Sequence, residues 1–198
     1  MKNLIIISSV MLSCSLFTAC DGTNKPSSIS FVKDSTNRKS SSAAAKSGVN
    51  QKVTEFITGL IKNYLQLKNA LTKDDSNDAA TAGSELANGF VKFDRSTLTA
   101  SQKKSFEDIA DDAKEMAEHI GKSAGNIRHQ REHFDMLSKD MYDLVKLLGT
   151  GQSLYVDHCP MYNDKKGAIW LSENKEIKNP YMGSNMSTCG TVKEELNK

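Results

Sequence analysis

The chain has 198 residues, of which 38% are hydrophobic and 25% are charged, and its formal net charge at pH 7 is +2. A charge so close to zero argues against a nucleic-acid-binding protein and gives no sign of a strongly basic membrane-binding surface. The length suits one domain with a substantial core.

Residues 1–19 have the pattern of a signal peptide and are not expected to belong to the folded domain. Lys2 supplies a short positive region, and Leu4 to Leu16 form an apolar stretch that is too short to span a membrane. Small residues then precede Cys20, as in a bacterial lipobox, although Phe17 replaces the usual aliphatic residue. We expect Cys20 to carry lipid and to anchor the protein in the cell envelope. A simple secretory signal with an incidental cysteine is the alternative.

Residues 20–48 are rich in Ser, Asn, Lys and Thr and contain few apolar side chains. Such a composition cannot offset the entropy lost on ordering, so this segment is expected to be a flexible tether. Of the four cysteines, Cys14 leaves with the signal peptide and Cys20 carries lipid, so Cys159 and Cys189 remain. The compartment outside the inner membrane permits disulfides, and this pair can therefore be a staple or a metal site.

We expect a single domain over residues 49–198. Within it, residues 49–148 show apolar side chains every three or four positions, which predicts helices. Short polar segments separate them, so we expect a mainly α fold with an up-down bundle of about four helices. The third and fourth segments can also form one long helix that bends at Gly121 and Gly125. The periodic positions are Val53, Phe56, Ile57, Leu60, Ile61, Tyr64, Leu65, Leu71, Leu86, Phe90, Val91, Phe106, Ile109, Ala113, Met116, Ile120, Ile127, Phe134, Leu137, Met141, Leu144, Val145 and Leu148.

Residues 149–198 form a different, Cys/Met-rich module. Leu154–Val156 and Ala168–Leu171 have the composition of short strands, Asn179-Pro180-Tyr181 indicates a turn, and Thr191–Asn197 is predicted to be a short helix. The module has too few apolar residues to fold alone. We therefore expect it to pack on the bundle as an irregular unit with short strands.

Soft metal ligands gather in this module. Cys159 and Met161 are two residues apart, which places them on one face of an extended segment, and Met186 and Cys189 lie on one side of a helical turn. Facing each other, the two pairs would supply two thiolates and two thioethers, with His158 at the edge. That ligand set selects Cu(I) or a related soft metal and is too sulfur-rich for Mg²⁺ or Ca²⁺. The alternative is a Cys159–Cys189 disulfide with the methionines as core filler.

The segment His129-Gln130-Arg131-Glu132-His133 matches the H-x-x-E-H signature of a class of zinc peptidases. Two histidines four residues apart on a helix can share a metal. The rest of the chain offers no convincing further acidic ligand and no substrate-binding sheet, so a peptidase is disfavoured. His133 can instead act as an auxiliary metal ligand. His119 is expected to be a solvated helix residue. No phosphate loop or nucleophile motif is present, and we expect no enzymatic activity.

Five short motifs resemble a domain of unknown function that occurs in lipoproteins of Gram-negative bacteria. They are Gln130-Arg131-x-x-Phe134-x-x-Leu137-Ser138, Tyr155-x-x-His158-Cys159-Pro160-Met161, Trp170-Leu171-Ser172, Ile177-x-Asn179-Pro180-Tyr181 and Met186-x-x-Cys189-Gly190. That domain is also fused to the C-terminal end of periplasmic adaptor subunits of copper and silver efflux pumps. The resemblance covers roughly Val49 to Leu196 and implies an extracytoplasmic heavy-metal role, with copper as the metal.

The sequence therefore predicts a lipid-anchored, mostly helical domain that faces the periplasm or the cell surface. It would bind Cu(I) for sequestration or for handover to an efflux-pump adaptor or another envelope protein. The competing hypothesis is a structural or interaction lipoprotein whose two cysteines form a staple.

Overall fold

The computed structural model describes the backbone of residues 41–197 and the side chains of residues 51–197. The predicted signal peptide, the lipidation site at Cys20 and most of the predicted tether lie outside the described residues. No helix in the described part of the chain is long and apolar enough to cross a membrane.

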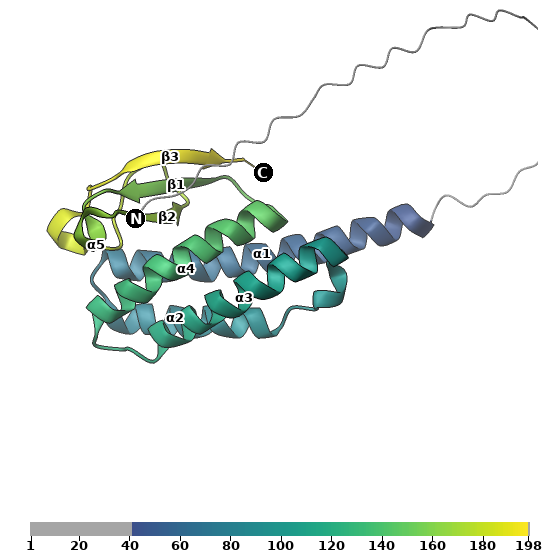
Figure 1. Cartoon of the computed structure of the whole chain (residues 1–198), viewed down its shortest axis with the longest axis horizontal. Helices are drawn as coiled ribbons and strands as arrows, with labels where there is room; N and C mark the ends of the chain where they lie inside the picture. The colour runs from purple at the N-terminus through teal and green to yellow at the C-terminus, as the bar shows by residue number, and fades with distance from the viewer. Residues whose placement is uncertain (1–40, 198) are drawn as a thin grey trace, which may run out of the picture. The chain divides into compact units, whose positions relative to one another are not determined.

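Four helices form the first part of the fold, which confirms the predicted mainly α class (Figure 1). They are α1 (Ser41–Thr72), α2 (Ser76–Val91), α3 (Ala100–Gly121) and α4 (Ile127–Leu148), with a short 3-10 turn, η1 (Arg95–Thr97), between α2 and α3. Helix α1 includes residues 41–48, which the sequence assigned to the tether. The alanine-rich composition of that segment suits a helix, so the domain boundary suggested at Val49 falls inside a continuous helix.

The helices run up and down, because contacts between neighbours join residues in opposite order along the chain. On α1 and α2, Asn63 Nδ2 donates to the Glu85 carbonyl at 3.2 Å, and Phe56 meets Phe90 edge to face at 6.5 Å. Helices α3 and α4 are separate rather than one bent helix. Lys122 ends α3, and the side chain of Asn126 caps α4 by accepting from the backbone N–H of His129 at 3.2 Å.

The second part is a three-stranded antiparallel sheet of β1 (Leu154–Cys159), β2 (Ala168–Ser172) and β3 (Thr191–Leu196), in the order β2-β1-β3. The first two strands confirm the sequence prediction. The terminal helix predicted over Thr191–Asn197 is wrong, because this segment pairs with the open edge of β1 from Leu154↔Leu196 to His158↔Thr191. Seven residues are too few for a stable helix in water, whereas the strand edge supplies backbone partners.

The sheet lies along the side of the bundle formed by α1 and α4, away from α2 and α3 (Figure 1). At this junction Tyr64 is fully buried; its hydroxyl pairs with Ser138 Oγ at 2.7 Å and accepts the backbone N–H of Leu171 at 3.1 Å. Phe134 stacks on Tyr64 at 5.2 Å and also contacts Tyr181. One continuous hydrophobic core therefore joins bundle and sheet, as the module's small apolar content requires.

Arg131 on α4 fixes the long segment between β2 and β3 to the end of α1. Its guanidinium donates to the Pro180 carbonyl at 2.8 Å, to the Leu71 carbonyl at 2.9 Å and to Asp74 at 2.5 Å. Asp74, which has a positive φ of 59°, accepts the backbone N–H of Ser184 at 3.0 Å with its other oxygen. This charged pair thus positions the segment that leads to the second cysteine.

Candidate metal centre

The fold brings Cys159 and Cys189 together, although they are 30 residues apart in sequence. Cys159 is the buried last residue of β1, and Cys189 is half-buried just before β3. Both thiols are free, and their sulfur atoms lie 3.0 Å apart. A disulfide bond is about 2.05 Å long, so the two groups are in hydrogen-bond contact without being bonded covalently.

The pairing of β1 with β3 explains why Cys159 and Cys189 are in contact. The register places His158 opposite Thr191, so the residues on either side of that pair also approach each other. The backbone N–H of Cys189 closes a turn on the Met186 carbonyl at 3.1 Å. Asn179 then fixes the Cys189 backbone, because its Nδ2 donates to the Cys189 carbonyl at 2.6 Å.

The surroundings of Cys159 favour its thiolate. Burial alone raises the pKa of this thiol, but hydrogen bonds from Cys189, from the backbone N–H of Met161, from Asn179 and from the backbone N–H of Tyr162 together lower it. The pKa of Cys189 is raised, chiefly by its hydrogen bond with Cys159. Hydrogen bonding within the pair therefore favours a negative charge on the inner sulfur over the outer one, and thiolate is the form that binds metals and attacks disulfides.

The two predicted methionine ligands lie at the surface. Met161 is 48% exposed and Met186 is 42% exposed, each in the backbone segment that leads to or from a cysteine. His158 and Cys159 are consecutive on β1, so their side chains leave opposite faces of the strand, and the His158 ring lies against Gly167. The structure thus brings the cysteines together, exposes both thioethers and directs the imidazole to the other face of β1.

Within residues 51–197, no group of three or more His, Cys, Asp or Glu side chains is arranged to hold a metal ion. The described His, Cys, Asp and Glu side chains therefore add no third ligand to the preformed pair of thiols.

An unusual turn follows the Cys-Pro-Met segment. In α5 (Tyr162–Lys165) the residues Asn163, Asp164 and Lys165 have φ values of 52°, 53° and 67°, so the backbone is left-handed over three consecutive non-glycine residues. Asn and Asp tolerate this conformation better than other residues, whereas Lys does not. Sequence reasoning missed the turn, although the Asn-Asp pair was a signal for it. Such strain is found preferentially beside functional sites.

A buried carboxylate two residues before Cys159 was also missed. Asp157 is fully buried, and neither of its oxygens accepts a hydrogen bond of standard geometry, although the Trp170 side chain lies close enough to lower its pKa slightly. Burial raises the pKa of Asp157 to about 7; the nearby Lys68 opposes this rise and Glu173 adds to it. Lys68 is itself buried and pairs with Glu173 at 2.7 Å.

A second group of possible metal ligands lies on α3 and α4. The His119 ring stacks on His133 at 4.6 Å with an interplanar angle of 6°, and His133 Nε2 lies 3.1 Å from His129 Nε2. Burial, followed by the nearby His129 and His119, lowers the pKa of His133. His119, which was expected to be a solvated helix residue, is thus exposed but packed on another imidazole.

Bundle, sheet and paired thiols together define a helical domain with a small C-terminal thiol-bearing module. Residues 60–153 match the model of a family described as "Protein of unknown function (DUF3347)". The match covers most of the bundle and stops before β1, so Cys159 and Cys189 lie outside it. This supports the predicted similarity to a domain of unknown function. No curated protein and no solved structure matches the chain.

Proposed function

We propose that this chain is an extracytoplasmic lipoprotein that binds Cu(I) through Cys159 and Cys189, without catalysing a reaction. The observation that supports this proposal is the pair of free thiols 3.0 Å apart, held by different segments of one small module. Cu(I) accepts few and soft ligands, so two thiolates can bind it without a complete tetrahedral set. A structural zinc site needs four protein ligands, and the described residues do not provide them here.

The hydrogen bonds at Cys159 suit a metal-bound thiolate. Backbone N–H groups of Met161 and Tyr162 point at this sulfur and stabilise its negative charge. Second-shell donors of this kind orient a metal ligand and tune the bound metal. Met161 and Met186 flank the pair with exposed thioethers, which can complete the coordination of a soft ion or pass it on.

We propose that the protein sequesters the bound copper or hands it over to an efflux-pump adaptor or another envelope protein. The choice of copper and of this class of partner rests on the resemblance set out above, and the location rests on the lipobox-like segment before Cys20. Exposed methionines at the site are compatible with transfer, since a partner's ligands can reach a metal held near the surface.

The second candidate function is a structural or interaction lipoprotein in which the two cysteines form a disulfide. The short distance between the sulfur atoms favours this alternative too, because a small rotation of the half-buried Cys189 brings them to bonding distance. Counting free thiols in protein purified without reductant separates the two functions. A resting metal site gives two thiols for Cys159 and Cys189 in a Cys14→Ser/Cys20→Ser background, and a staple gives none.

Anaerobic titration of the reduced full chain with Cu(I), against a competing chelator, tests the proposal. We expect one tightly bound Cu(I), far weaker binding of Zn(II), and loss of most of the affinity in Cys159→Ser and in Cys189→Ser. Met161→Leu and Met186→Leu should weaken binding modestly, because they remove thioethers at nearly constant volume.

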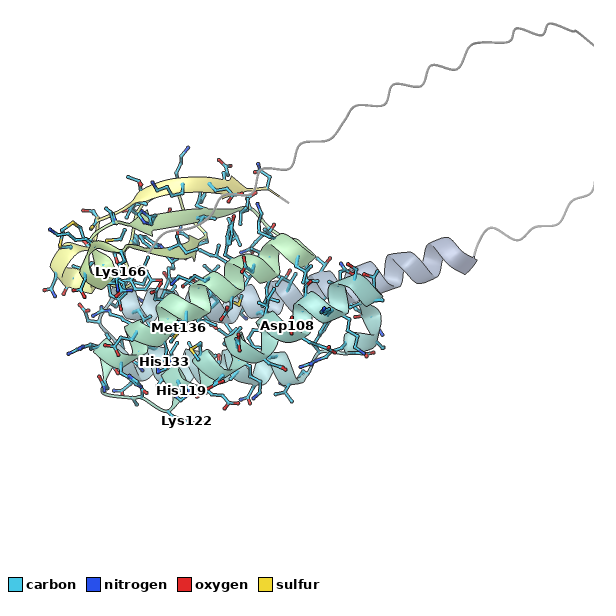
Figure 2. The ribbon with its side chains drawn as sticks, viewed as in Figure 1. Asp108, His119, Lys122, His133, Met136 and Lys166 are labelled. Atoms are coloured by element: carbon cyan, nitrogen blue, oxygen red, sulfur yellow. The ribbon has the colours of Figure 1, made fainter. Side chains whose placement is uncertain are left out.

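Met136→Leu is the matched control. Met136 is equally exposed, at 43%, but lies on α4 away from the sheet (Figure 2), so its replacement should leave the Cu(I) affinity unchanged. If the double Cys→Ser variant competes for Cu(I) as well as the unaltered protein does, the metal-binding proposal is wrong.

A further inference from the structure

Three of the four histidines of this chain lie together on helices α3 and α4 of the bundle, whereas the cysteine pair lies in the sheet module. His119 on α3 and His133 on α4 are side by side in Figure 2, near the loop that contains Lys122, whereas Lys166 marks the sheet module. His129 is one helical turn before His133 on α4 and contacts it edge to face at 4.4 Å. All three rings are half-buried or exposed, so an ion in solution can reach them.

The Nδ1 atoms of His129 and His133 each lie near an atom that can accept a hydrogen bond. His133 Nδ1 lies 3.4 Å from the sulfur of Met116, and His129 Nδ1 lies 3.5 Å from a carboxylate oxygen of Glu132. When each Nδ1–H is directed at its acceptor, each Nε2 keeps a free lone pair. Histidines that ligate metals almost always donate their other N–H in this way, usually to a carboxylate, carbonyl or water.

The two Nε2 atoms then face each other at 3.1 Å. Between two neutral rings, a direct hydrogen bond requires one ring to carry its proton on Nε2, which removes the Nδ1–H directed at Met116 or at Glu132. A bound cation satisfies both lone pairs and keeps both Nδ1 contacts. With metal–nitrogen distances of about 2.0–2.1 Å, the observed separation gives an angle of roughly 100° at the metal.

We propose that His129 and His133 form a second metal site, for a divalent transition-metal ion that is bound through the two Nε2 atoms, with Cu(II) held most tightly. Two imidazoles at adjacent coordination positions suit the tetragonal geometry of Cu(II), which also has the highest affinity in the divalent series. Water completes the coordination. His119 is stacked parallel to His133, so its ring nitrogens do not converge on the same point.

This site is independent of the proposed Cu(I) pair, because it uses no cysteine and lies on another part of the fold. The surrounding charges favour a cation. Glu132 lies next to His129, and Glu115 lies 3.6 Å from His119 Nε2. Arg128 also pairs with Glu132, at 3.2 Å, and so partly offsets that charge.

Titration of the full chain with Cu(II) tests the proposal, in a Cys159→Ser/Cys189→Ser background that removes the proposed Cu(I) ligands. We expect one Cu(II) per chain, and an electron paramagnetic resonance spectrum with hyperfine coupling to two imidazole nitrogens. His129→Gln and His133→Gln should each weaken binding more than about tenfold and should abolish the two-nitrogen spectrum. Met116→Leu should weaken binding by about tenfold, since second-shell partners contribute at that level.

His119→Gln is the matched control, and we expect its Cu(II) affinity to stay within about threefold of the background protein. Far-ultraviolet circular dichroism establishes that each variant is folded; His129→Gln alters an accessible side chain and should not unfold the helix. Unchanged binding in His129→Gln, or an equal loss in His119→Gln, would refute the site. Because Cys159 and Cys189 are replaced throughout, failure here leaves the Cu(I) proposal untouched.

Discussion

Asp157 illustrates how single residues in this fold respond to pH. Its side chain is buried in β1 without a hydrogen bond of standard geometry, and burial raises its pKa from 3.8 to about 7. The unfolded chain releases this proton near pH 4, whereas the folded protein keeps it up to about pH 7. The contribution of Asp157 to stability therefore falls as pH rises from 4 to 7 and is constant above that range.

We accordingly predict that Asp157→Asn stabilises the protein at pH 8 and has little effect at pH 4. The amide has nearly the shape of the protonated acid but cannot ionise, so the gain is at most about 4 kcal/mol for a shift of about three pKa units. Urea denaturation of both proteins at the two pH values measures the difference. A variant that is less stable than the parent at pH 8 would show that the ionised carboxylate is stabilised by Lys68.

The contact between Asp74 and Arg131 operates at the scale of whole elements, because it joins α1, α4 and the segment before Cys189. Hydrogen bonds from Ser184 and Arg131 lower the pKa of Asp74 from 3.8 to about 2. The stabilisation that results is complete above pH 4 and is lost as pH falls through about 2. Asp74→Asn should therefore lower the free energy of unfolding at pH 7, by about 1 kcal/mol after solvent screening, and by less at pH 2.

Denaturation at the two pH values tests this, with Asp108→Asn as the control. Asp108 is exposed on α3, where Figure 2 shows it away from the sheet, and its replacement should change stability little at either pH. An equal loss in Asp74→Asn at pH 7 and pH 2 would mean that packing, rather than charge, accounts for the role of Asp74.

Elements also differ in how well the sequence predicts them. The bundle follows from apolar spacing, because residues such as Leu60, Tyr64 and Phe134 repeat at helical intervals and are all buried. Strand β3 could not be predicted, since Thr191–Leu196 carries residues that form helices and becomes a strand only because β1 has an open edge. Composition indicated the two cysteines, but their contact and the exposure of Met161 and Met186 depend on strand register and turn geometry.

At the scale of the whole molecule, bundle and sheet share one core. The Tyr64 hydroxyl connects α1 with Ser138 on α4 and with the backbone of β2, and all of these groups are buried. The thiol pair is therefore built on a module whose stability depends on helices that contribute no ligand. A metal bound at Cys159 and Cys189 should thus stabilise the entire domain, because a ligand that binds only the native state shifts its unfolding equilibrium.

The location of the whole molecule depends on Cys20, which lies outside the described residues. A lipobox-like stretch precedes this cysteine and a polar segment follows it, so we predict that Cys20 is acylated in the bacterial envelope. Mass spectrometry of the mature N-terminus should find the lipid on Cys20, and the protein should sediment with membranes. Cys20→Ser should abolish lipid labelling, whereas Cys14→Ser, in the part removed with the signal peptide, should not. A mature chain that is soluble with an unmodified Cys20 would contradict anchoring, and would leave any metal bound at the thiol pair free to diffuse with the protein.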